Sequence, residues 1–312
     1  MSRAPLWAIT TYFNPAGYRR RRQNYQLFRE RLALPLVTVE LSFQEGFELR
    51  PGDADILVQI RGGNIMWQKE RLLNIAAEKV PAECRKIAWV DSDVLFADDG
   101  WPERANEALE EVLLLHLFQE CSDLPRDARP EEWGGDGPGV PAPSMVYRMI
   151  AEGIAPEDLL LRHPRVRRTA TNGLAWASRR EVLDAHGFYD ACILGSGDRA
   201  ILSAAIGKFD CCTRGLQMSA RRAAHYLAWA QPYFETVRGR IGYLPGRVLH
   251  LWHGEIKDRR YGDRDRDLAA LDFDPFDDIA LDPGGAWRWS SDKPDLHAFI
   301  KSYFASRNED GP

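Results

Sequence analysis

The sequence predicts an α/β fold in which a mostly parallel sheet is flanked by helices. Short β-rich segments and segments of helical periodicity alternate along the first 120 residues, which is typical of such a sheet. One apolar strand ends in two carboxylates one residue apart, Asp91 and Asp93. Ligands of open α/β sheets bind at such strand ends. With 312 residues, the chain is long enough for one large domain or two modest ones.

Each element of this first part follows from its own pattern. Strands are expected at 6–11, 35–41, 55–60 and 86–90, where apolar and β-branched residues form short runs. Helices are expected at 24–32, 67–80 and 103–118; in the second of these, Leu72, Leu73, Ile75 and Ala76 form an apolar stripe.

The remaining chain is less regular. Residues 121–165 are rich in Pro, Gly and acidic residues, and we interpret them as an insertion or flexible loop. Regular structure is expected to return at Thr169. The segment 263–312 is acidic, contains Pro and Trp, and is expected to wrap the core. We expect one domain, 1–312, with two halves at 1–120 and 166–262.

Composition narrows the class of protein. The chain is 45% hydrophobic and 28% charged, with a net charge of −5, which predicts a globular protein without a strongly basic surface for nucleic acid. It does not exclude a local basic groove. Five cysteines without C-x-x-C spacing indicate reduced thiols. With no signal-like apolar core and no run of about 20 apolar residues, we expect a cytoplasmic protein with no membrane span.

The Asp91-Ser92-Asp93 motif is the strongest chemical signal. Two carboxylates at a strand end suit a hard divalent cation, which commonly holds a phosphate-bearing substrate. A solvated turn is the alternative, and the apolar residues on both sides make it the weaker one.

Three further motifs fit the same chemistry. The loop 195–198 is Gly-Ser-Gly-Asp, so Asp198 could be a general base or the acidic cap of the next helix. His250 and His253 are three residues apart, so both could bind one metal or be structural. Four arginines at 19–22 could neutralise a diphosphate or begin a solvated helix.

Taken in their order along the chain, the arginine run, the D-x-D strand, the Gly-Ser-Gly-Asp loop and the histidine pair resemble features of the GT-A sugar-nucleotide glycosyltransferases. The resemblance is closest to their β-1,4-galactosyltransferase-like branch. The segments that carry the resemblance are 63–74, 89–93, 172–177, 187–188 and 195–198, together with His250 and His253. The similarity covers roughly 6–30, 60–110 and 168–262. It departs from the family at Asp198, which is followed by Arg199 and Ala200 rather than by further acids.

The resemblance implies a GT-A type, Rossmann-like fold with a nucleotide-sugar-binding half, an acceptor-side subdomain and an irregular C-terminal tail. It implies Mn²⁺ or Mg²⁺ bound by Asp93, His250 and His253. It also implies a nucleoside-diphosphate sugar as donor, a UDP-sugar before others, and inversion with Asp198 as the general base. Asp91 is expected to contact the ribose or the sugar.

Substrate contacts follow from the same comparison. Donor contacts are expected from Phe13, Arg20, Arg22, Trp67, Lys69, Asp91 and Asp93. Acceptor contacts are expected from Trp176, Tyr189 and Asp190, although core packing explains Trp176 equally well.

Other functions remain open on the sequence alone. A haloacid-dehalogenase-type phosphatase would use Asp91 as nucleophile and Asp93 as acid and base, and a nucleotidyltransferase would share the donor-site chemistry. A non-catalytic sugar-nucleotide or nucleic-acid binder is a third class. The charged stretch 258–266 has the pattern of a surface ion-pair network. The acceptor is expected to be a glycan or a hydroxymethylated base in phage DNA.

Overall fold

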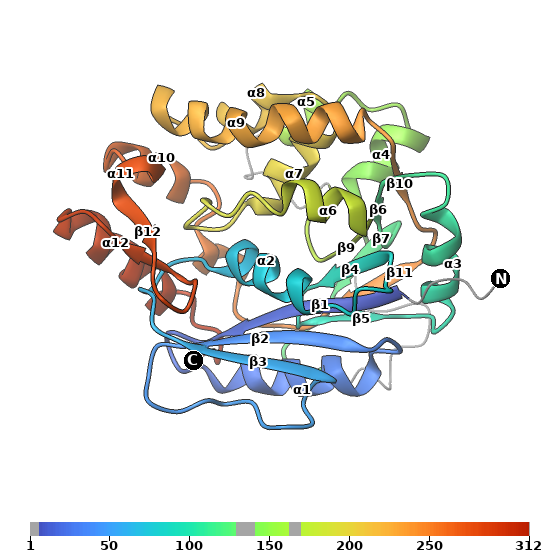
Figure 1. Cartoon of the computed structure of the whole chain (residues 1–312), viewed down its shortest axis with the longest axis horizontal. Coiled ribbons are helices and arrows are strands. Elements are labelled where there is room, and N and C mark those ends of the chain that lie inside the picture. Colours follow the sequence, from blue (N-terminus) through green and yellow to red (C-terminus); the bar gives the residue numbers. More distant parts are fainter. Residues whose placement is uncertain (1–5, 129–140, 162–169, 312) are drawn as a thin grey trace.

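A computed structural model describes residues 6–128, 141–161 and 170–311 (Figure 1). Its centre is a seven-stranded sheet in the order β10-β6-β9-β4-β1-β2-β3. Strand β9 is antiparallel to both of its neighbours, and the other neighbouring pairs are parallel. The prediction of a mostly parallel α/β sheet flanked by helices is therefore confirmed.

The first four strands and two helices match the expected order. They are β1 (Leu6–Phe13), α1 (Arg19–Arg31), β2 (Leu36–Ser42), β3 (Ile56–Arg61), α2 (Lys69–Lys79) and β4 (Lys86–Val90). Alternate residues of β1 face opposite sides of the sheet, so Ala8 packs in one core with Phe28 of α1, and Ile9 packs in the other with Leu72 of α2. Helices α1 and α2 thus cover opposite faces (Figure 1).

The strand order creates a crevice beside β1. The chain passes from β1 to β2 and β3 on one side, then returns to place β4 on the other side. At such a reversal the loops that follow two parallel strands diverge, leaving room for a ligand at their carboxyl ends. The residues after β1 and β4 border this crevice.

A second, four-stranded sheet lies next to the carboxyl end of β4. Its order is β5-β11-β7-β8, with bounds β5 (Val94–Phe96), β11 (Arg247–His250), β7 (Glu120–Asp123) and β8 (Ala142–Pro143). Strand β5 follows the D-x-D motif directly and pairs antiparallel with β11, so that His250 lies opposite Val94. This pairing brings the distant histidine pair to the motif.

The remaining strands complete the main sheet or form a separate two-stranded sheet. The strands are β6 (Leu114–His116), β9 (Ala175–Arg179), β10 (Ile241–Tyr243), β12 (Ile279–Leu281) and β13 (Trp287–Trp289). The helices are α3 (Trp101–Ala108), α4 (Met145–Ala151), α5 (Pro156–Leu160), α6 (Arg180–His186), α7 (Gly197–Ala205), α8 (Phe209–Thr213), α9 (Ala220–Val237), the 3₁₀ turn η2 (Ile256–Arg259), α10 (Arg264–Ala270), α11 (Pro275–Asp278) and α12 (Pro294–Ala305). Among the described residues, no helix combines the length and apolarity that crossing a bilayer requires.

Two expectations about elements need correction. The helix expected at 103–118 ends at Ala108, and Leu114–His116 form strand β6 inside the main sheet. All three residues of β6 are buried, the polar His116 included, and periodicity alone cannot separate such a strand from a buried helix. The loop expected at 121–165 contains most of β7 and all of β8, α4 and α5, while its stretches 129–140 and 162–165 lie outside the described residues.

Candidate active site

A cavity of about 330 Å³ lies at the carboxyl ends of β1 and β4. Its walls come from segments far apart in the sequence, namely 10–13, 89–93, 170–174, 195–199, 259–265 and single residues that include His250, His253 and Arg307. The loop before α7 and the C-terminal third of the chain thus add further walls to the crevice expected from the strand order.

Asp93, His250 and His253 form a candidate metal site on one wall of the cavity. One ligand atom from each lies within 4.8 Å of the other two. The Nε2 atom of His253 is 3.1 Å from Asp93 Oδ2, and the Nε2 atoms of the two histidines are 3.0 Å apart. The spacing of the two histidines along the sequence therefore corresponds to convergence in space.

The protonation of these side chains suits a metal ligand set. Burial, with the nearby Arg259 guanidinium, lowers the pKa of His253 to about 3, so the imidazole is neutral at neutral pH. Burial opposes ionisation of Asp93, yet the surrounding His253, His250 and Arg259 side chains hold the pKa of its carboxyl below the usual value. Metal ligands must be deprotonated in this way.

The lone pairs of the cluster also fit a cation. His250 Nδ1 faces Asp123 Oδ1 at 2.7 Å, which places the proton on Nδ1 and leaves a lone pair on Nε2. Arg259 Nη2 donates to Nε2 of His253 at 2.6 Å, so that atom is also an acceptor. Asp93 Oδ1 is buried without a hydrogen-bond partner among the described residues. Three acceptors thus converge, and one carboxylate with two imidazoles suits Mn²⁺ or a similar divalent ion.

Lys69 joins the two other carboxylates of the cavity. Its Nζ atom is 2.6 Å from Asp91 Oδ1 and 3.3 Å from Asp198 Oδ2. Burial disfavours the ammonium, but Asp198 and Asp91 raise the pKa of Lys69 above its ordinary value. Burial also raises the pKa of Asp91 to about 6, against the opposing effect of Lys69. Lys69 therefore carries a fixed positive charge between the D-x-D motif and the loop before α7.

The loop before α7 is shaped by tight backbone contacts. Ser196 has a left-handed backbone with φ of 79°. At Gly197, a Cβ atom would lie 2.1 Å from Oε1 of Glu70, so only glycine fits there. Burial raises the pKa of Glu70 to about 8, so this carboxyl is protonated at neutral pH. The close packing fixes the first turn of α7 and hence the position of Asp198.

Aromatic side chains line the cavity beside β1. Phe13 and Trp67 meet edge to face with 5.6 Å between ring centroids, and Trp67 stacks on Phe304 of α12 at 6.4 Å. Phe13 and Trp67 line the cavity, as expected of donor contacts, and a nucleobase could lie against this edge.

Positive charge on the cavity wall comes largely from residues that sequence reasoning missed. The cationic side chains that line the cavity are Arg21, Lys69, Arg199, Arg259, Arg264 and Arg307. Arg259 and Arg264 belong to the stretch that we interpreted as a surface ion-pair network, but both are buried. Arg307 lies in the tail, where no motif marks it. The alternation of acidic and basic residues in 258–266 did not indicate that two of its arginines would be buried.

One of the four arginines that follow β1 lines the cavity. Residues 19–22 form the first turn of α1, whose geometry turns successive side chains to different directions. Arg21 lines the cavity, whereas Arg20 and Arg22 do not. The Arg20 guanidinium instead lies over the Trp252 ring, 5.4 Å from its centroid. Of these arginines, the structure therefore places Arg21 at the cavity, and not Arg20 or Arg22, from which donor contacts were expected.

The three residues expected to contact an acceptor lie outside the cavity lining. Trp176 is fully buried and stacks on Trp89 with 6.4 Å between centroids. Tyr189 packs among the aromatic residues of α9. Asp190 accepts hydrogen bonds from Arg71 and from Asn74. We therefore reassign Trp176 and Tyr189 to packing in the core, and Asp190 to its ion pair with Arg71 and its hydrogen bond from Asn74.

Comparisons with known proteins give structural matches only. No family model matches the sequence, and no curated protein matches it. Three solved structures illustrate the matches. Glucosyl-3-phosphoglycerate synthase from Mycobacterium tuberculosis, in complex with Mn²⁺, UDP and phosphoglyceric acid, is 13% identical with a TM-score of 0.44, over 95% of this chain and 91% of that one. TarS of S. aureus is 12% identical with a TM-score of 0.40, over 98% and 72%. A mutant of Drosophila β1,4-galactosyltransferase 7 with manganese, UDP-Gal and xylobiose is 12% identical with a TM-score of 0.31, over 63% and 58%.

Proposed function

We propose that this protein is a metal-dependent glycosyltransferase that moves a sugar from a nucleoside-diphosphate sugar, foremost a UDP-sugar, to an acceptor hydroxyl. The observation that carries the proposal is the convergence of Asp93, His250 and His253 in the cavity that also contains Asp198. A divalent-ion site, a basic wall and a separate carboxylate in one cavity match the needs of transfer from a diphosphate.

The chain supplies three functions around the donor. Asp93, His250 and His253 would hold Mn²⁺ or Mg²⁺, which when bound neutralises charge on the diphosphate. Arg21, Arg259 and Arg307 line the cavity and present guanidinium groups for the phosphate oxygens. Phe13 and Trp67 offer ring surfaces to the nucleobase.

Asp198 is the proposed general base. Its carboxylate takes the proton of the acceptor hydroxyl as that oxygen bonds to the anomeric carbon and the bond from this carbon to the diphosphate breaks. Attack from the side opposite the leaving group inverts the anomeric centre. Lys69, 3.3 Å from Asp198 Oδ2, keeps the carboxylate oriented in the cavity.

The geometry disfavours the phosphatase alternative. Asp91 would be the nucleophile, but it is bound by Lys69 at 2.6 Å, and burial raises its pKa to about 6. An ammonium at this distance neutralises much of the carboxylate's charge and so weakens it as a nucleophile.

The test measures release of nucleoside diphosphate from a panel of sugar nucleotides with Mn²⁺. We expect turnover with one donor, and a loss of about 10²-fold to 10⁴-fold in Asp198→Ala, the usual effect of removing a general base. Asp93→Ala should lose turnover, and the turnover that remains should no longer depend on Mn²⁺. Asp184→Asn, at a carboxylate that is 62% exposed, is the matched control and should behave as wild type.

The acceptor is sought in the same assay. Glycans and DNA containing hydroxymethylated bases are added in separate reactions, and stimulation of diphosphate release identifies the class. Cleavage of generic phosphomonoesters, with no sugar nucleotide turned over, would overturn the proposal in favour of a phosphatase. Release of pyrophosphate from a nucleoside triphosphate and a sugar 1-phosphate, supplied in place of the sugar nucleotide, would identify a nucleotidyltransferase.

A further inference from the structure

Glu309 is a buried carboxylate that links distant parts of the cavity. It lies in the stretch after α12, and its side chain is 0% exposed. Its oxygens accept hydrogen bonds from Arg21 Nε and Arg307 Nε, both at 2.5 Å. Burial raises the pKa of an acid, but the two guanidinium groups bring the pKa of Glu309 well below its usual value. A buried carboxylate of this kind persists only when it is well paired.

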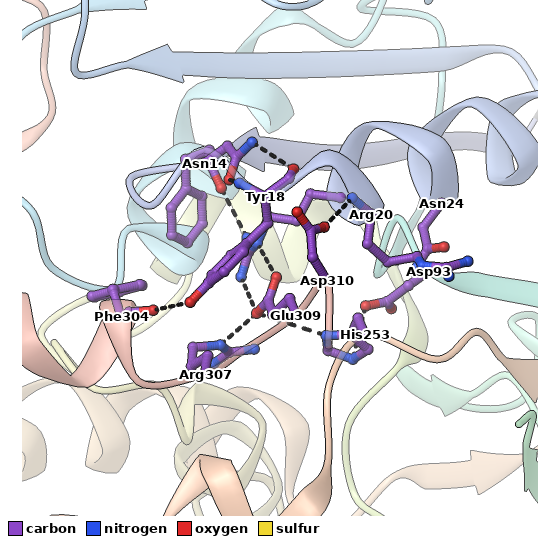
Figure 2. Close-up of polar contacts among 12 residues, drawn as sticks. Asn14, Tyr18, Arg20, Asn24, Asp93, His253, Phe304, Arg307, Glu309 and Asp310 are labelled. Atoms are coloured by element: carbon purple, nitrogen blue, oxygen red, sulfur yellow. Dashed lines mark hydrogen bonds and ion pairs between the residues drawn. The ribbon is translucent and has the colours of Figure 1, made fainter. Parts of the chain in front are cut away.

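The same carboxylate faces a proposed metal ligand. Figure 2 shows Glu309 between Arg307 and His253, with Asp93 on the other side of the imidazole. Glu309 Oε1 is 3.8 Å from His253 Nδ1, while Nε2 of that ring is turned toward Asp93. His250 has a similar but closer arrangement, since its Nδ1 lies 2.7 Å from Asp123 Oδ1. Each imidazole thus has a carboxylate behind it and a lone pair toward the shared centre, as in many protein metal sites.

Backbone packing holds Glu309 against the histidine segment. Gly254 follows His253 and has φ of +93°, and a Cβ atom there would lie 2.6 Å from the carbonyl oxygen of Arg307 and 3.3 Å from Cα of Glu309. Only a residue without a side chain allows this approach. The two segments are therefore in direct contact over several residues.

Neighbouring residues attach the same stretch to α1. Asp310 accepts hydrogen bonds from the backbone N–H groups of Arg19 and Arg20 at the start of that helix, where negative charge is favourable. The N–H of Asn308 donates to the Tyr18 hydroxyl at 3.1 Å. Figure 2 shows the contact between Arg20 and Asp310, next to Glu309. Glu309 is therefore held from both sides, and its position relative to Arg21 is fixed.

We propose that Glu309 is a positioning residue that orients His253 as a metal ligand and presents Arg21 and Arg307 to the phosphates of the donor. This inference rests on the proposed function for the donor, whereas its metal part needs only the site itself. The negative charge of Glu309 keeps the His253 proton on Nδ1. The lone pair of Nε2, which accepts a hydrogen bond from Arg259, then faces the site and is available to a cation that displaces this donor. It also holds two guanidinium groups side by side, which their mutual repulsion would otherwise separate.

The test uses Mn²⁺ alone, measured by electron paramagnetic resonance on the full chain. Glu309→Gln keeps the shape and removes the charge, and we expect Mn²⁺ affinity to fall about 10-fold to 100-fold, as for other residues behind metal-binding histidines. Asp310→Asn is the matched control, because it removes a neighbouring charge that does not face the metal site; its Mn²⁺ affinity should change less than about threefold. Spin-echo modulation should show two coupled imidazole nitrogens in wild type and a weakened second coupling in Glu309→Gln.

Further variants keep the outcome decisive. Glu309→Asp retains the negative charge but places it farther from His253, so we expect a Mn²⁺ affinity between those of wild type and Glu309→Gln. This variant is used if Glu309→Gln does not fold. Unchanged Mn²⁺ affinity and unchanged nitrogen coupling in a folded Glu309 variant, with both lost in His253→Ala, would overturn the proposal. UDP binding is measured separately in the presence of Mn²⁺. If the variant weakens Mn²⁺ binding while no sugar nucleotide is bound by any form, the proposed function fails and the positioning role of Glu309 stands.

Discussion

Individual side chains around the cavity are constrained by one another more than by the sheet that carries them. Glu70 and Gly197 are the clearest pair, because the carboxyl of one occupies the space that any side chain at the other would need. Both lie in segments that the sequence analysis singled out, 63–74 and 195–198, but neither segment indicates that the two residues meet. Their interdependence leads to two predictions at the level of single residues.

The first prediction concerns the pH dependence of stability. Burial raises the pKa of Glu70 from 4.5 to about 8, so the folded protein keeps a proton that the unfolded chain has already released. The free energy of unfolding therefore falls as the pH rises through this window, by up to about 1.4 kcal/mol per pH unit from this group. Glu70→Gln has no such proton, so its stability relative to wild type should increase between pH 5 and pH 8.

Urea unfolding at both pH values measures this difference. Glu78→Gln changes an exposed acid on the same helix and should show no pH-dependent gain. A stability difference between Glu70→Gln and wild type that stays constant with pH would show that Glu70 is ionised in the folded protein.

The second prediction concerns the backbone beside Asp198. In Gly197→Ala the new methyl group must displace Glu70 or the first turn of α7, which moves the proposed base. We expect turnover to fall at least about 10-fold, since small displacements of reacting groups have large kinetic effects. Gly46→Ala is the control, because a Cβ there meets nothing within 4 Å. Equal activity in both variants would exclude a steric role for Gly197.

Single residues also show where sequence reasoning succeeds and where it stops. Asp93, His250 and His253 could be proposed together because each belongs to a short motif with metal-ligand spacing. Arg307 and Glu309 could not, since Glu309 meets Arg21 across 288 residues and neither lies in a pattern of its own. Contacts of that range depend on the complete fold.

At the scale of elements, strands buried on both faces are the main source of wrong expectations. Residues 114–116 form a strand between β9 and β10 where a helix was expected, because the apolar run 112–118, interrupted only by His116, has no period to distinguish the two. The same burial explains Trp176, whose position on β9 between β4 and β6 leaves its ring no access to the cavity. The expected helices that form one apolar face, α1 and α2, have bounds within a few residues of those expected.

A third prediction separates packing from substrate contact at β9. Trp176 is fully buried and donates a hydrogen bond from Nε1 to the carbonyl of Asn172 at 2.9 Å. Trp176→Phe should therefore lower the free energy of unfolding by about 1–3 kcal/mol, through lost packing and a carbonyl without its partner. Its acceptor KM should match wild type. A raised acceptor KM at unchanged stability would restore the contact role that we have reassigned.

On the scale of the whole molecule, the cavity and the surface differ in charge. The chain has a net charge of −5, yet cationic side chains outnumber carboxylates among the residues that line the cavity. The carboxylates are Asp91, Asp93, Asp198 and Asp265. An anionic ligand is thus repelled by the molecule at long range and attracted at short range.

A fourth prediction follows for UDP binding. Raising the salt concentration from about 0.1 M to about 1 M shortens the screening length from about 10 Å to about 3 Å. At constant Mn²⁺, the dissociation constant for UDP should rise severalfold, and Arg259→Gln should show a smaller rise. Titration calorimetry measures both. Uridine, which lacks the diphosphate, is the control ligand and should bind with little salt dependence; equal salt dependence for both ligands would contradict an electrostatic role for the basic wall.

The connection between Arg21 and Glu309 also has a consequence in time. The two residues are 288 positions apart, and chains are synthesised at about 5–20 residues per second. Arg21 and the strands around it therefore leave the ribosome on the order of tens of seconds before their partner exists. During that interval the sheet can assemble while the pocket remains without one of its walls. A nascent chain of this protein should fold early and become competent to bind only late.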